Sequence, residues 1–205
     1  MIEKNNKIKG FSLIELMIAM TILLVLMGVA ASLFAGAMGT RTRESRKTDA
    51  LTSATAALNI ISREISNSGY GLNTNGIVTA DSNGQKIHFR ANITNGDYAT
   101  DDAGEDITYF FDTPTQSIVR YDPHNANGTT SVIVNRISSV AFLYYDYVGS
   151  SSTATSSTTP SNNTGRVTIT VTVQLEEVQG QPKNQTVTFK SDVTIRNSAY
   201  MLNQY

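Results

Sequence analysis

The chain divides into an apolar N-terminal stretch and a more polar remainder. A basic leader with Lys4, Lys7 and Lys9 runs into an apolar segment, and residues 16–40 are 25 consecutive residues without a charge. A helix needs about 20 apolar residues to cross a bilayer. The pattern therefore predicts a helix that enters a membrane, with residues 14–38 as the approximate transmembrane part.

Beyond residue 40 the apolar pattern changes, but we expect the same helix to continue. Apolar residues recur there at three- and four-residue spacing, which is typical of an amphipathic helix packed on a sheet. This stripe consists of Leu51, Ala54, Leu58, Ile61 and Ile65. Gly69 follows it, and glycine commonly ends a helix. The prediction is one helix over residues 11–67.

Residues 68–205 predict a β-rich head. Seven runs of β-branched and aromatic residues, separated by turn clusters, indicate strands at 76–81, 85–93, 106–112, 117–122, 131–148, 166–177 and 185–197. Residues 166–175 alternate most cleanly, so one face of that strand should lie on the helix. Residues 149–165 are rich in Ser and Thr and predict a flexible loop or hairpin tip. The fold class is α+β, with the long N-terminal helix packed on a mostly antiparallel sheet.

Composition excludes several kinds of chemistry. The chain has no cysteine, which rules out disulfides and thiol catalysis, and its formal net charge of −1 gives no electrostatic basis for binding nucleic acid. His88 falls in a strand pattern and His124 in a turn, and neither has an evident partner. The G-x-S-x-G motif of hydrolases is missing. We therefore expect no enzymatic activity and no cofactor.

One acidic loop is a candidate metal site. It contains Asp97, Asp101, Asp102, Glu105 and Asp106 together with glycine. Carboxylate oxygens are the ligands that Ca²⁺ prefers, although the spacing of an EF-hand is missing. A solvated acidic loop without metal is the alternative.

Glu15 interrupts the beginning of the apolar segment and decides how that segment is interpreted. A secretory signal peptide would explain Ala35-Gly36-Ala37 as its small-residue cleavage site. However, the apolar run is too long for a signal peptide, and a charge near the centre of an inserted helix costs about 2.5–3.5 kcal/mol. A plain membrane anchor explains the length but leaves Glu15 unexplained.

The residues KGFSLIE (9–15) resemble the prepilin signature of type IV pilins and type II secretion pseudopilins. The resemblance implies that a membrane-bound prepilin peptidase removes residues 1–10 by cleaving between Gly10 and Phe11. The same enzyme then methylates the new N-terminal amine of Phe11. Glu15 becomes the fifth residue of the mature chain.

The resemblance also gives Glu15 a role in assembly. Cleavage creates a cationic amine on Phe11, four residues before Glu15 and about 6 Å away along a helix axis. The carboxylate could pair with this amine in its own chain. In the family it instead pairs with the amine of a neighbouring subunit, which would fix the stagger between helices. The sequence leaves both alternatives open.

The segments "ISREISNSGYG", "RISSVAFLYYD" and "VTIRN" look like those of PilW-type minor pilins and the related J-type pseudopilins of type II secretion. Major pilins usually have a proline early in the mature helix, whereas the first proline after the leader here is Pro114. The resemblance therefore implies a minor pilin that acts in pilus assembly, initiation or tip function. A type II secretion pseudopilin is the alternative within the class. A secreted β-rich adhesin or binding module with an ordinary signal peptide is the alternative outside it.

Partners and localisation follow from the same resemblance. The basic leader should stay in the cytoplasm, which places the head in the periplasm of a bacterial cell until the subunit enters a surface filament. The expected partners are other pilin subunits, met through the N-terminal helix, the prepilin peptidase and methyltransferase, and the inner-membrane assembly platform.

Overall fold

The computed structural model describes residues 10–126, 128–149, 152–175, 177 and 182–203. The chain divides into two compact units, of which the first comprises Met1–Ser45 with Val178–Gln181 and the second comprises Arg46–Glu177 with Pro182–Tyr205. Except for Gly10, the predicted leader of residues 1–10 lies outside the described residues. The expected α+β architecture is confirmed, since a long N-terminal helix packs on antiparallel sheets.

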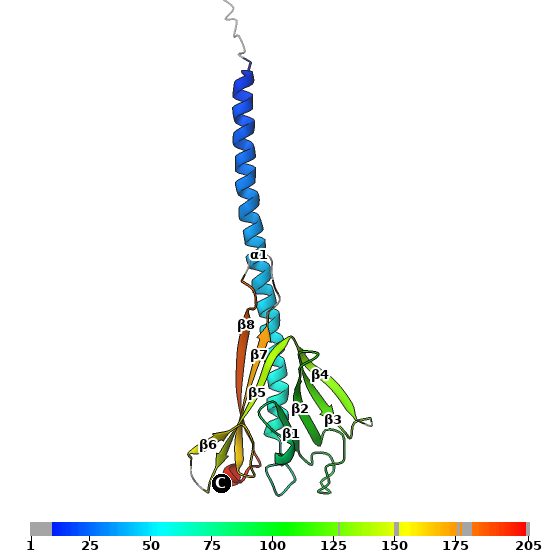
Figure 1. Ribbon diagram of the computed structural model, residues 1–205. Coiled ribbons are helices and arrows are strands. Elements are labelled where there is room, and N and C mark those ends of the chain that lie inside the picture. The colour runs from blue at the N-terminus through cyan, green and yellow to red at the C-terminus, as the bar shows by residue number, and fades with distance from the viewer. Residues whose placement is uncertain (1–9, 127, 150–151, 176, 178–181, 204–205) are drawn as a thin grey trace, which may run out of the picture. The chain divides into compact units, whose positions relative to one another are not determined.

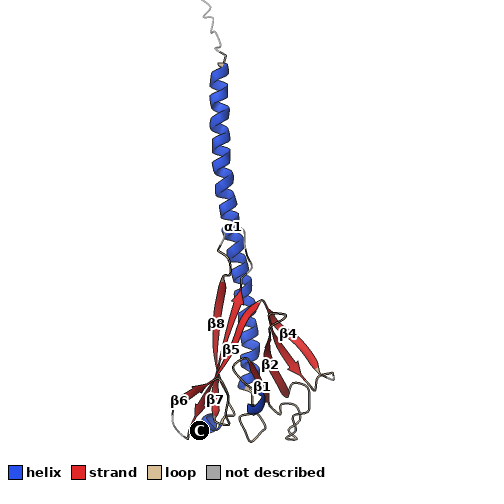
Figure 2. Ribbon diagram, in the orientation of Figure 1, coloured by secondary structure: helices blue, strands red, loops and turns tan. Residues whose placement is uncertain are grey.

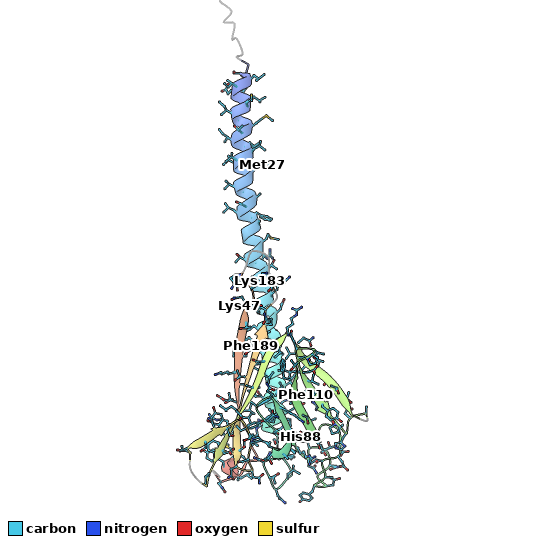
Figure 3. The ribbon with its side chains drawn as sticks, viewed as in Figure 1. Met27, Lys47, His88, Phe110, Lys183 and Phe189 are labelled. Atoms are coloured by element: carbon cyan, nitrogen blue, oxygen red, sulfur yellow. The ribbon has the colours of Figure 1, made fainter. Side chains whose placement is uncertain are left out.

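Helix α1 (Leu13–Ser66) begins two residues after the predicted start and ends one residue before the predicted end. Within the first unit its apolar side chains are exposed, as Leu16 (56%) and Met27 (62%) illustrate, and Figure 3 shows the side chains around Met27 projecting from the helix. Among the described residues it is the one helix long and apolar enough to cross a membrane. An apolar surface of this extent is suited to lipid or to contact with other helices.

The described residues of the second unit form eight strands in two antiparallel four-stranded sheets, drawn as red arrows in Figure 2. The first sheet has the order β1-β2-β3-β4, with β1 (Lys86–Arg90), β2 (Asp106–Asp112), β3 (Ser117–Asp122) and β4 (Thr129–Asn135). The second has the order β6-β5-β7-β8, with β5 (Ile137–Tyr147), β6 (Ala154–Ser157), β7 (Thr164–Gln174) and β8 (Thr186–Thr194). A 3₁₀ helix η1 (Thr79–Asp81) precedes β1, and a short helix α2 (Ala199–Leu202) follows β8.

Both sheets share one hydrophobic core with the second half of α1, which lies between them in Figure 1. The helix contributes Ala54, Ala57, Leu58, Ile61 and Ile65. This confirms the predicted stripe except at Leu51, which is 48% exposed. Strand β7 buries every second residue, as its alternating pattern predicts. Each fully buried aliphatic side chain contributes about 1.5–3 kcal/mol, so this core holds the helix and both sheets together.

The structure differs from the predicted strands at three places. Residues 76–81 form η1 and an isolated bridge between Ile77 and Phe89 instead of a strand. The long run 131–148 is broken at Arg136, whose φ of 61° lies in the left-handed region. This break moves the chain from β4 in the first sheet to β5 in the second. The loop 149–165 contains strand β6, which pairs with β5.

Gly69 ends the helix region as predicted, and its backbone conformation requires glycine. Its φ is +79°, and its N–H donates to the carbonyl of Arg90 at 2.9 Å. A Cβ at this position would lie 2.4 Å from the carbonyl oxygen of Thr74. The turn therefore brings the end of α1 directly against the end of β1.

Candidate processing and assembly segment

The Gly10–Phe11 bond lies immediately before α1 in non-helical backbone. Phe11 is 84% exposed, and no atom of a described residue lies within 4 Å of a Cβ built on Gly10. Inside a helix the backbone N–H and C=O groups are engaged with residues one turn away. The predicted cleavage point is thus exposed, and neither Gly10 nor Phe11 makes a backbone hydrogen bond with another described residue.

Ser12 and Glu15 form the start of α1. The carbonyl of Ser12 accepts the N–H of Leu16 at 3.1 Å, and Glu15 lies in the first turn. Their S-x-x-E spacing is that of a capping box, but neither side chain makes a capping hydrogen bond with another described residue. What remains is the favourable interaction of a first-turn carboxylate with the helix dipole, about 0.3–1 kcal/mol.

Glu15 has no hydrogen-bond or ion-pair partner among the described residues. The structure is that of the uncleaved chain, in which Phe11 contributes a neutral amide instead of an amine. Cleavage would place a cation at the positive end of the helix dipole, where a carboxylate within one turn offsets the repulsion. Whether that carboxylate meets its own amine or a neighbour's stays a prediction.

The alternative cleavage site is placed differently. Ala35, Gly36 and Ala37 lie within α1, more than five helical turns from its start. Their backbone groups are engaged in the helix. The Gly10–Phe11 bond is therefore the more accessible of the two.

The acidic loop considered as a calcium site is organised by hydrogen bonds within the protein. Among the described residues no group of three or more His, Asp or Glu is placed to hold a metal ion. Glu105 is 1% exposed and accepts the N–H groups of Ile93 and Thr94, both at 2.8 Å, and of Asp102 at 3.3 Å. Burial alone would raise the pKa of Glu105, but these backbone donors outweigh burial and lower it. Glu105 thus acts as the internal anchor of its loop.

The other acids of the loop point to separate partners. Asp97 accepts the N–H of Ala99 at 2.9 Å, and Asp102 accepts the side-chain amide of Asn95 at 2.8 Å. Asp101 is exposed, and the carboxylate of Asp106 faces β1. Because these carboxylates bind protein donors in different directions, they do not converge on one cation.

A charged cluster joins η1 to β1 and β2, and it contains His88. The Nδ1 atom of His88 lies 2.9 Å from Asp81, and its Nε2 atom contacts Asp106. Lys86 donates to Asp81, and Arg90 donates to Asp106 at 2.9 Å. The hydrogen bond from Lys86 lowers the pKa of Asp81, partly opposed by burial. The expectation that His88 has no evident partner was therefore wrong, and the signal was the alternation of Lys86, His88 and Arg90 on one strand face.

A second polar network attaches the end of α1 to the first sheet. The Glu64 carboxylate accepts the Tyr109 hydroxyl at 2.8 Å and the Arg120 Nε at 3.1 Å, and Arg120 also donates to Asp122 at 3.4 Å. Burial, and then the charge of Glu64, raise the pKa of Tyr109 far above its usual range. Burial would lower the pKa of Arg120, but Glu64 raises it overall. Glu64 lies outside the apolar stripe of α1, so the hydrophobic pattern of the sequence gives no sign of this role.

Comparison with known proteins bears on the N-terminal segment only. Residues 5–31 match the family model of the prokaryotic N-terminal methylation motif. No curated protein and no solved structure matches the chain significantly. The motif supports a type IV pilin or pseudopilin-like protein, processed by a prepilin peptidase and assembled with other pilins. The apolar helix is consistent with membrane anchoring.

Proposed function

We propose that this chain is a minor type IV pilin, a structural subunit that enters a filament through α1 after the prepilin peptidase removes residues 1–10 and methylates Phe11. The observation that carries the proposal is the placement of the Gly10–Phe11 bond. It is exposed and non-helical, and it directly precedes an apolar helix whose first turn holds Glu15. Pilin-type proteins are structural, so no catalytic site is required.

Exposure of the apolar part of α1 fits a subunit that exchanges lipid for other helices. Its apolar side chains are unburied in the single chain. In lipid, helices associate through close packing and polar contacts, because the hydrophobic effect does not drive them together. A carboxylate without a partner is costly in such surroundings. A neighbouring amine at the right stagger removes that cost, so Glu15 would select the register of assembly.

A minor role is favoured over a major one by two features of the sequence. The first proline after the leader is Pro114, so the early helix lacks the proline common in major pilins. The β-rich region also resembles PilW-type minor pilins in the segments quoted above. The subunit would first sit in the bacterial inner membrane with its head in the periplasm, and then in a surface filament.

N-terminal sequencing and intact mass of the protein from its native membrane test the processing step. We expect a chain that begins at methylated Phe11. The control is the same protein from cells without prepilin peptidase, which should keep residues 1–10. A chain that begins at Met38, after Ala35-Gly36-Ala37, would instead support the secreted β-rich adhesin or binding module.

A type II secretion pseudopilin is the second candidate, because the same segments resemble the J-type pseudopilins. Purified surface pili separate the two possibilities when probed with an antibody to the β-rich head. Labelled pili support the minor pilin. Loss of protein secretion on deletion of the gene, with pili intact and unlabelled, supports the pseudopilin.

A further inference from the structure

A cavity of about 510 Å³ opens on the first sheet, at the face turned away from α1. Strands β1 and β2 direct Ile87 and Tyr109 into the core, so their neighbours His88 and Phe110 face the other side. Figure 3 labels both His88 and Phe110. Ligand-binding pockets commonly measure about 300–1,000 Å³, so this cavity has the size of a small-molecule site.

The charged groups of the cavity already have partners. Asp81 is bonded to Lys86 and His88, and Asp106 is bonded to His88 and Arg90. Among the described residues of the lining, each of these charges thus lies within hydrogen-bonding distance of an opposite charge. A purely hydrocarbon ligand would cover these charges and exclude water from them, which is unfavourable. The charged cluster therefore argues for a neutral, polar ligand.

Three uncharged polar groups of the lining remain available. The hydroxyls of Thr108 and Tyr121 and the side-chain amide of Gln85 make no hydrogen bond with any other described residue. Thr108 is only 6% exposed. Tyr121 is 38% exposed and Gln85 is also exposed, so these groups can be reached from the mouth of the cavity. These three groups can give and accept hydrogen bonds from a molecule in the cavity.

Flat apolar surfaces lie beside those polar groups. Tyr121 is the cross-strand neighbour of Thr108 in the β2–β3 ladder, and Phe110 and Pro123 also line the cavity. An aromatic ring packs against the C–H face of a saturated ring while polar neighbours bind its rim. The cavity thus offers apolar planes and hydrogen-bonding groups within a few residues of each other.

We propose that this cavity binds a neutral carbohydrate of one or two pyranose units. A pyranose has an apolar C–H face for Tyr121 or Phe110, and hydroxyls at its rim for Thr108 and Gln85. This inference goes beyond filament assembly and does not rest on it, since the cavity lies wholly in the second unit. The subunit would then contribute saccharide recognition in addition to a structural role.

The test is saturation-transfer NMR on the full chain in a detergent without a sugar headgroup. The probes are D-glucose, D-galactose, N-acetyl-D-glucosamine, lactose and cellobiose. Sorbitol serves as a polyol without a ring, inorganic phosphate as an anion and choline as a cation. We expect transfer to the ring protons of at least one sugar and none to the three comparison molecules.

Variants then locate the binding site. Thr108→Val keeps the shape of the side chain and removes its hydroxyl, and Tyr121→Ala removes a ring. Each should weaken sugar binding about tenfold or more, the loss expected for one hydrogen bond or one ring contact. Tyr98→Ala is the matched control, because Tyr98 is 78% exposed and does not line the cavity. The amide spectrum of each variant reports whether the sheet stays folded.

The proposal fails if no sugar receives magnetisation, or if sorbitol, phosphate or choline receives as much. It also fails if folded Thr108→Val and Tyr121→Ala bind as tightly as the unaltered chain. An equal loss in Tyr98→Ala would overturn it too, because the sugar would then be binding outside the cavity.

Discussion

Replacing Glu64 by alanine tests whether one carboxylate holds the end of α1 on the first sheet. The Tyr109 hydroxyl, on a side chain with 0% exposure, would lose its acceptor. An unsatisfied buried polar group costs about 1–3 kcal/mol. Arg120 is 18% exposed and would keep only Asp122, at 3.4 Å. We expect the free energy of unfolding to fall by about 2–4 kcal/mol. This is slightly less than the usual cost of breaking a buried ion pair, because Glu64 is 26% exposed.

Two control variants separate the network from general effects on the helix. Glu64→Gln keeps an acceptor for Tyr109 and removes the charge, so it should cost about half as much as Glu64→Ala. Asp49→Ala removes an exposed carboxylate from the same helix and should change stability by less than about 0.5 kcal/mol.

A double-mutant cycle that combines Glu64→Ala with Arg120→Met measures the coupling free energy between Glu64 and Arg120 directly. Without Glu64, the arginine is a partly buried charge with a weakened partner, so replacing it should cost less than it does in the unaltered chain. We expect a coupling free energy of about 1–2 kcal/mol.

The assay is denaturant unfolding of the full chain in detergent, followed by near-ultraviolet circular dichroism. The chain has nine tyrosines and no tryptophan, so the signal comes from tyrosine packing in the β-rich unit. A loss below about 0.5 kcal/mol for Glu64→Ala, or strict additivity in the cycle, would refute the attachment role.

Three further predictions concern other positions. Glu15→Ala should be cleaved normally but excluded from filaments, whereas Ser12→Ala should assemble. Filament pull-down of tagged subunits measures the incorporation of both variants. If both lost incorporation equally, the role of Glu15 would be confined to the start of the helix. Since the folded pKa of Glu105 lies below its ordinary value of 4.5, its stabilising contribution is present above that pH and is lost as pH falls through the folded pKa. Glu105→Gln should therefore lower stability at pH 7 by about 1–3 kcal/mol and flatten the acid limb of unfolding curves. Gly69→Ala should lower stability by about 1–3 kcal/mol, and so the melting temperature by several degrees, because the new Cβ would clash with the carbonyl oxygen of Thr74. An unchanged melting temperature would contradict the positive φ of this residue.

Much of the fold could be predicted because it depends on local periodicity. The stripe on α1 and the alternation of β7 each follow from which face of one element is buried, and such a pattern is visible in a short window. The break between β4 and β5 was not visible in this way. β-branched residues occur shortly before Arg136, at Val134, and directly after it, at Ile137, so its left-handed backbone marks the boundary between two strands that belong to different sheets.

The polar sites show the same division between local and distant information. Gly10, Phe11 and Glu15 form a contiguous motif, which is why the sequence could point to them. The Glu64 network joins residues 45 and 56 positions apart, and His88 meets Asp106 18 positions away. Contacts of that kind depend on the register of strands, which hydrophobic patterns do not specify for polar side chains.

Glu15 and Glu64 place two carboxylates on one helix, and they differ in when each finds a partner. Glu64 meets Arg120 and Tyr109 of its own chain, so it is satisfied as soon as the β-rich unit folds. Glu15 has no partner among the described residues of the uncleaved chain, and the resemblance supplies one only after cleavage creates an amine. Folding of the β-rich unit should therefore proceed before processing, while assembly must wait for it. Glu64→Ala should weaken folding without blocking cleavage, and Glu15→Ala should block assembly without changing the unfolding curve. If Glu15→Ala altered the unfolding curve, the carboxylate would already be satisfied within the folded chain, and its role in selecting a neighbour would be lost.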